Sequence, residues 1–103
     1  MGNMYHILFF NVLPEKKEEV PKLMENLKKA MRKVERVELA GLFFPRGSGY
    51  MYATMIKYQD YATWEKFWMS PEVIPVRQKG NAIITEQMDM FLDEMAYAYP
   101  KLR

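Results

Sequence analysis

The sequence predicts an α+β domain of the ferredoxin-like class, with a four-stranded antiparallel sheet covered by helices on one face. Two observations predict it. The periodicity of the apolar residues gives the order strand, helix, strand, strand, helix, strand. The chain has 103 residues, of which 50% are hydrophobic and 27% charged, as in one globular domain. We therefore assign residues 1–103 to a single domain.

The first strand and helix are the clearest elements. Met4–Val12 is apolar and aromatic at both alternating positions, as a central strand should be, and Pro14 follows it closely. Between about residues 18 and 36, apolar residues recur at steps of three and four, which places one apolar stripe on a helix. Pro21 is expected in the first turn, where its missing N–H matters least.

A hairpin is expected next. Val37–Phe44 and Tyr50–Tyr58 have the composition of strands, and Gly41 is a candidate β-bulge in the first of them. Residues 45–49 read Pro-Arg-Gly-Ser-Gly, which is typical of a turn.

The second helical region begins at Asp60, a candidate N-cap. It carries an aromatic stripe at helical spacing, formed by Tyr61, Trp64, Phe67 and Trp68. Ser70-Pro71-Glu72 restarts a helical segment that Pro75 is expected to distort. Gly80-Asn81 is the expected stop, although residues 82–84 are apolar enough to extend the helix.

The chain then ends in a strand and a tail. Residues 87–94 alternate polar and apolar side chains, so we expect a strand at a sheet edge. Residues 96–100 form an aromatic tail.

Composition excludes several function classes. The net charge of only +2 disfavours nucleic-acid binding. The absence of cysteine excludes disulfides, thiolate metal sites and Fe–S clusters, and a lone histidine gives no reason to predict a metal site. The longest apolar stretch, Leu39–Phe44, is too short to span a membrane, and the N-terminus does not resemble a signal peptide. We expect a cytoplasmic protein with no membrane partner.

The first and third strands are apolar at both parities. One layer of helices covers only one face of the sheet, so the other face needs a second cover. A second copy of the chain is the simplest one, and we predict a homodimer, with higher oligomers built from it left open.

Three short stretches carry a resemblance to a known family. They are Tyr5–Val12 running into Pro14-Glu15-Lys16, then Tyr58–Trp64, then Met69-Ser70-Pro71-Glu72. In this order they resemble the dimeric α/β-barrel superfamily, and within it the antibiotic-biosynthesis-monooxygenase-like proteins. The resemblance implies two ferredoxin-like sheets packed face to face, with a cavity beside each sheet.

That family includes cofactor-independent oxygenases of polycyclic aromatics, haem-degrading oxygenases and lactone isomerases. The resemblance to the haem-degrading type puts Asn11 at its strand asparagine, Phe67 at its tryptophan, and Arg77 or Gln78 at its histidine ligand. No histidine follows His6 in this chain. We therefore predict neither haem degradation nor any other cofactor.

Six side chains are the candidate site residues. Asn11 and Arg77 are the catalytic candidates: Asn11 would hold a substrate oxygen, and Arg77 or a tyrosine would stabilise an enolate. The candidates for binding an aromatic substrate are Trp64, Phe67, Trp68 and Tyr52.

Each candidate has a structural alternative. Asn11 is also suited to bonding local backbone at the strand end, Arg77 to a solvated position, and the aromatic side chains to the core. Phe67 and Trp68 lie about 100° apart on a helix, so at least one ring is expected to reach a cavity or an interface. His6 has the pKa of a general base but no carboxylate near it in sequence, which favours a structural role.

Two functions remain open. The first is a cofactor-independent, monooxygenase-like enzyme acting on an aromatic or polycyclic substrate. The second is a non-catalytic module that binds or senses a small apolar or aromatic molecule. The second has negative support, because no nucleophile–base pair is visible in the sequence.

Overall fold

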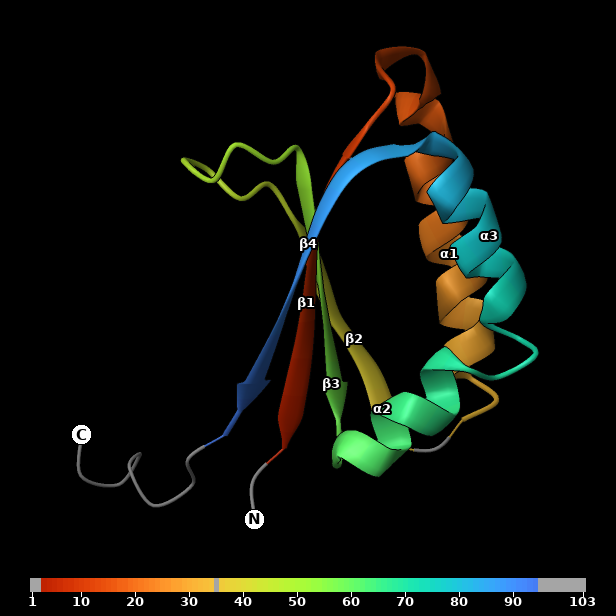
Figure 1. The fold of residues 1–103 in the computed structure, drawn as a ribbon. Helices are drawn as coiled ribbons and strands as arrows, with labels where there is room; N and C mark the ends of the chain where they lie inside the picture. Colours follow the sequence, from red (N-terminus) through yellow and green to blue (C-terminus); the bar gives the residue numbers. More distant parts are fainter. Residues whose placement is uncertain (1–2, 35, 95–103) are drawn as a thin grey trace.

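The computed structural model describes residues 3–34 and 36–94, and these residues form a sheet with helices on one face (Figure 1). Its elements are β1 (Met4–Val12), a 3-10 helix η1 (Pro14–Glu19), α1 (Val20–Met31), β2 (Val37–Phe43), β3 (Tyr52–Tyr58), α2 (Tyr61–Trp68), α3 (Ile74–Ile83) and β4 (Ile84–Asp93). The strands are antiparallel in the order β2-β3-β1-β4. This arrangement confirms the predicted ferredoxin-like α+β fold.

Strand β1 lies inside the sheet, between β3 and β4. Its residues alternate between two faces, so Met4, His6 and Phe10 are buried beneath the helices, while Tyr5 and Ile7 on the other face are half-buried. Strand β4 lies at the edge, as predicted.

The first helix differs from the prediction. The expected helix from about 18 to 36 is a 3-10 turn followed by α1, which ends at Met31. Pro21 lies in the first turn of α1, as predicted. The prediction extended the helix too far because the chain must reverse to place Val37 beside Tyr58, and it does so with Arg36 in the left-handed region at φ 65°.

The β2–β3 hairpin contains the expected bulge and turn glycines. The register shifts between Leu39 and Gly41, which confirms the bulge. Gly47 and Gly49 adopt positive φ, as this tight turn requires. The loop projects from the sheet on the side away from the helices (Figure 1).

The second helical region follows the prediction at its start and departs from it later. The Asp60 carboxylate accepts a hydrogen bond from the Thr63 N–H at 2.8 Å, which confirms the N-cap of α2. The expected distortion at Pro75 is wrong, because Pro75 lies in the first turn of α3, where no N–H is needed. Helix α3 continues past Gly80 to Ile83. The predicted aromatic tail lies outside the described residues.

Two hydrophobic clusters fill the space between sheet and helices. One gathers around Tyr58, Phe67 and Val73, and the other around Phe10, Val20 and Ile83. No helix in residues 3–34 and 36–94 has the length and apolar character needed to cross a membrane.

Candidate ligand pocket

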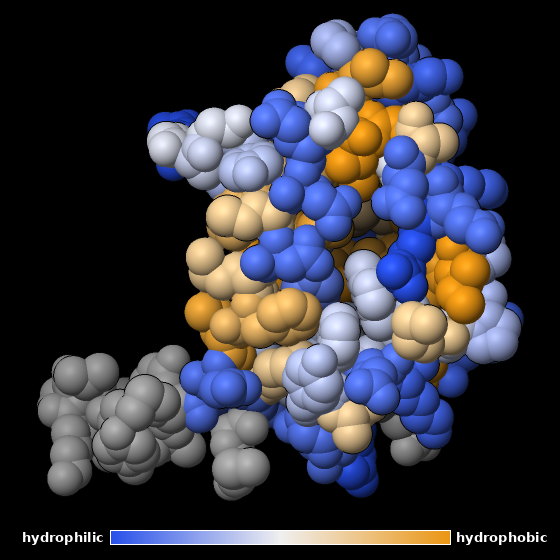
Figure 2. Space-filling view, viewed as in Figure 1, coloured by the Kyte–Doolittle hydropathy of each residue, from blue (hydrophilic) through white to orange (hydrophobic). Residues whose placement is uncertain are grey.

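A cavity of about 180 Å³ lies between the sheet and helices α1 and α3. Its apolar lining includes Leu8 and Ile56 from the sheet and Leu27 from α1. The polar members of its lining are His6, Thr54, Arg77, Asn81, Gln87 and Asp89. Figure 2 shows the hollow between the sheet and the helices, with apolar atoms inside and hydrophilic residues at its rim. A concave apolar site with a few polar groups is the usual form of a small-molecule site.

His6 is the buried centre of the polar network. The ring is 1% exposed and stacks on Phe91, with 4.5 Å between the ring centroids. The edge-on contact with Trp68 has a centroid separation of 5.1 Å. Burial lowers the pKa of His6 from its usual 6.5, although the hydrogen bond to Asp89 opposes this shift. We therefore treat His6 as neutral at pH 7.

The partners of His6 fix its tautomer. The Trp64 indole Nε1–H lies 3.3 Å from His6 Nδ1, and an indole can only donate, so Nδ1 is the acceptor. In the neutral ring the proton is then on Nε2, which donates to Asp89 Oδ2 at 3.1 Å. Both nitrogens are engaged, and neither is free to take a proton from a ligand.

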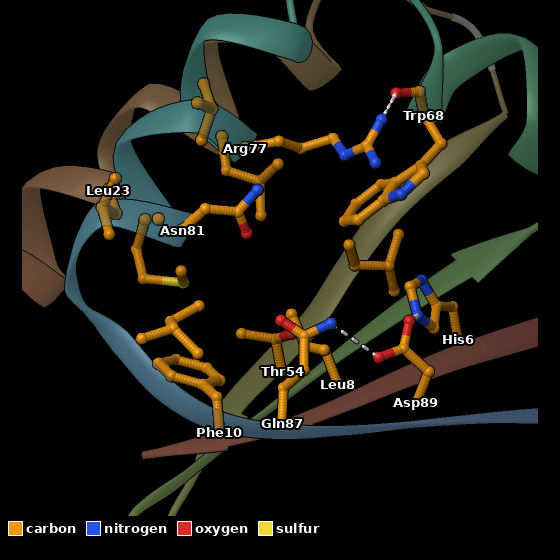
Figure 3. Close-up of a pocket in the computed structure, with 16 residues that line it drawn as sticks. His6, Leu8, Phe10, Leu23, Thr54, Trp68, Arg77, Asn81, Gln87 and Asp89 are labelled. Atoms are coloured by element: carbon orange, nitrogen blue, oxygen red, sulfur yellow. Dashed lines mark hydrogen bonds and ion pairs between the residues drawn. The ribbon is translucent and has the colours of Figure 1, made fainter. Parts of the chain in front are cut away.

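Asp89 is the carboxylate at the end of the series of hydrogen bonds that runs from Trp64 through His6. Its Oδ1 accepts a hydrogen bond from Gln87 Nε2 at 3.1 Å, and its side chain is 34% exposed (Figure 3). Two donors thus orient the carboxylate, while each oxygen keeps capacity for a further donor. A bound ligand with an acidic hydroxyl group would find its acceptor here.

Arg77 supplies positive charge from the other wall, on α3 (Figure 3). Its guanidinium lies over the Trp68 ring, 5.0 Å from the centroid, and its Nη1 donates to the Trp68 carbonyl at 3.1 Å. These contacts hold the cation beside the cavity. The pocket therefore has a carboxylate on β4 and a guanidinium on α3.

Two of the six predicted site residues, Arg77 and Trp68, line the pocket. Trp64 touches the site through its bond to His6. Phe67 is 0% exposed and lies in the core against Tyr58. Tyr52 stacks on Phe10, a lining residue, without lining the pocket itself.

Asn11 is not brought together with the others. It lies on the sheet face away from the helices, because its neighbours Phe10 and Val12 face the core. Its Oδ1 accepts from the Met51 N–H at 2.7 Å, and its Nδ2 donates to the Gly49 carbonyl at 3.4 Å and to Glu86 at 3.2 Å. The role is structural, but the bonded backbone is that of the β2–β3 loop and not the local backbone that the structural alternative expected.

Sequence reasoning missed Asp89 and Gln87 and assigned His6 a structural role. The alternation of residues 87–94 predicts an edge strand, but it does not say which of its two sets of side chains faces the helices. The pairing register of β1 and β4 is the signal that identifies Asp89 and Gln87. Asp89 pairs with Leu8, two residues from His6 on the same face, once β4 is placed antiparallel beside β1.

Solved structures share this fold over nearly the whole chain. A DABB family protein with a ferredoxin-like fold from Mesorhizobium loti is 13% identical, with a TM-score of 0.73 over 92% of this chain and 99% of that chain. SnoaB, a cofactor-independent oxygenase from Streptomyces nogalater, is 12% identical, with a TM-score of 0.76 over 92% and 95%. A hydroxynitrile lyase from Passiflora edulis is 11% identical, with a TM-score of 0.77 over 90% and 94%.

At these identities the likeness defines the fold alone, and it confirms the ferredoxin-like fold that the sequence predicts. No protein-family model matches the chain, and no curated protein matches it. The fold and the pocket together define a ferredoxin-like α+β protein with a cavity between its sheet and helices.

Proposed function

We propose that this protein binds a small aromatic molecule in the pocket and oxygenates it without a cofactor, as a monooxygenase-like enzyme. The observation that carries the proposal is an apolar cavity with an oriented carboxylate, Asp89, on one wall and a guanidinium, Arg77, on the other. A protein of the same fold, SnoaB, is a cofactor-independent oxygenase, which supports this choice among the chemistries the fold hosts.

The chemistry needs an electron-rich substrate and molecular oxygen. Asp89 accepts the acidic proton of a phenol or enol, and Arg77 stabilises the resulting anion. The anion reduces dioxygen, and the peroxide that forms on carbon loses water. A methylene and O₂ thus become a carbonyl and H₂O. His6 has no free nitrogen for this step, so we assign it the positioning of Asp89.

The alternative is a non-catalytic module that binds the same class of ligand. One observation favours it. Both nitrogens of His6 are already bonded, which leaves Asp89 as the single titratable acceptor lining the pocket among the described residues. Binding alone needs no group that removes a proton from the ligand.

Oxygen consumption distinguishes the two functions. Purified protein is mixed with hydroxylated aromatic compounds in air and under argon, while an oxygen electrode and mass spectrometry follow the reaction. An enzyme consumes oxygen in proportion to an oxygenated product, and Asp89→Asn abolishes this consumption. Asp93→Asn is the matched control, because Asp93 lies on the same strand outside the pocket lining. Binding without turnover would contradict the enzyme and support the module.

We also propose that a second copy of the chain covers the open face of the sheet. The apolar members of this face are Tyr5, Ile7, Phe9, Met55, Met88, Met90 and Leu92. Met88, Met90 and Leu92 are 39%, 39% and 42% exposed, which is unusual for one contiguous apolar surface. A sheet-to-sheet dimer would remove this surface from water and bury more than roughly 1,200 Å².

A further inference from the structure

We propose that the pocket is sized for a one-ring aromatic acid bearing a hydroxyl group, and that Gly80 sets this size. The inference rests on the proposed function, in that the pocket takes an aromatic ligand. The inference narrows the ligand from aromatic and polycyclic molecules in general to one-ring aromatic acids with a hydroxyl group.

The first argument is volume. The cavity measures about 180 Å³. A cavity of roughly 150 Å³ in a protein core holds benzene, whereas drug-sized ligands occupy pockets of roughly 300–1,000 Å³. One ring with small substituents fits inside this space, whereas part of a three-ring ligand would extend out of the hollow into solvent.

The second argument is Gly80. It is a buried glycine inside helix α3, a position where glycine is among the least favourable residues. A Cβ added there would meet Ile84 Cδ1 at 3.7 Å, which is an ordinary contact, so the surrounding protein does not require glycine. Gly80 lines the pocket. The volume that a side chain at this position would occupy is therefore available to the ligand.

The third argument is charge. Among the described residues that line the cavity, Arg77 is the one cation and Asp89 the one carboxylate. A ligand carboxylate pairs with a guanidinium through charge-assisted hydrogen bonds. A ring hydroxyl donates to Asp89 on the other wall. Figure 3 shows Arg77 on the helix side of the pocket and Asp89 on the strand side, so a ring placed between them can contact both groups.

Three probes of increasing size test the inference. They are 3-hydroxybenzoate, 4-hydroxy-2-naphthoate and 4-hydroxyanthracene-2-carboxylate, which keep the same spacing of hydroxyl and carboxylate, and each is titrated into the protein by calorimetry. We expect 3-hydroxybenzoate to bind with one site per chain, at least about tenfold more tightly than the three-ring probe. Arg77→Met should weaken its binding by about tenfold or more. Arg32→Met, an exposed arginine outside the pocket, should not.

Variants of α3 test the role of Gly80. Gly80→Ala should keep a cooperative melting curve and weaken binding of 3-hydroxybenzoate several-fold, and Gly80→Val should abolish it. Lys79→Ala, on the neighbouring position of the same helix, should leave the affinity unchanged. Equal affinities of Gly80→Ala and the original protein would overturn the assignment of Gly80.

The outcomes separate this inference from the proposed function. Tighter binding of the three-ring probe than of 3-hydroxybenzoate overturns the one-ring class and leaves an aromatic pocket in place. An unchanged affinity for 3-hydroxybenzoate in Arg77→Met overturns the inference that the ligand carries a carboxylate that pairs with Arg77. Failure of all three probes to bind contradicts the proposed function itself.

Discussion

The two faces of the sheet share the same strands and differ in how completely they are covered. On the helix side, Met4, His6 and Phe10 of β1 are 3%, 1% and 2% exposed. On the open side, Tyr5, Ile7 and Phe9 of the same strand are only half-buried. One chain therefore completes only one of its two apolar layers.

Strand β4 shows what the difference teaches. Its polar residues Gln87 and Asp89 face the helices, while its methionines face the open side. A strand at the edge of an isolated domain would be expected to point the other way, with polar side chains toward water. The inversion is consistent with a pocket that needs polar groups inside and a partner that needs apolar groups outside.

The covered face should depend most on Phe67, which is fully buried against Tyr58. Phe67→Ala removes this ring from the core and should lower the free energy of unfolding by about 3–5 kcal/mol. Urea denaturation measures the change. Phe44→Ala, in the β2–β3 loop at 79% exposure, is the control and should stay within about 0.5 kcal/mol. Equal effects of the two would remove the contrast between covered and open layers.

Substitutions on the open face should change the dimer dissociation constant and not the free energy of unfolding. Met90→Lys places a charge in the proposed interface and should raise the dimer dissociation constant at least about 30-fold, or about 2 kcal/mol. Met69→Lys, on the helix side after α2, is the matched control. Analytical ultracentrifugation measures both. A sedimentation profile that shows only monomer before any substitution would contradict the dimer.

Asn11 tests the link between the open face and the loop above it. Because its amide bonds Met51 and Gly49, Asn11→Ala should lower the free energy of unfolding by about 1–2 kcal/mol and leave ligand affinity unchanged. Thermal melting and calorimetric titration measure the two quantities on one preparation. Unchanged stability with weaker ligand binding would restore the ligand contact expected from the sequence.

The smallest effect should appear in the pH dependence of stability. The folded pKa of His6 is below its unfolded value of 6.5, so the unfolded chain binds more protons between these values. The free energy of unfolding should therefore fall as the pH drops from about 7 toward 5. His6 is the one histidine in the chain, so His6→Gln should flatten this slope. A slope that persists in the variant would assign it to another group.

Much of the fold could be predicted from sequence because local signals agree with it. Strand β1 is recognised because Met4–Val12 is apolar at both parities, and the Asp60 cap and the Gly41 bulge each depend on nearby residues. The end of α1 and the role of Pro75 could not be predicted, because they depend on where the chain must turn to meet its neighbours.

The site was harder to predict from the sequence, because it also depends on contacts between residues far apart in the chain. Arg77 and Trp68 were found because aromatic and cationic residues on a helix are visible in sequence. His6 and Asp89 are 83 residues apart, and only the pairing of β1 with β4 brings them together. Local alternation shows that Asp89 and Met90 point to opposite faces, but not which of the two faces the helices.

The hydrogen bond between Trp64 and His6 also makes the site observable by light. The chain has two tryptophans, and both rings lie against His6. All of its indole fluorescence therefore originates beside the pocket, with no background from elsewhere. A protonated imidazole quenches a neighbouring indole, and a ligand against Trp68 changes the polarity around it. Emission intensity and wavelength thus report the charge of His6 and the filling of the cavity in an unlabelled protein.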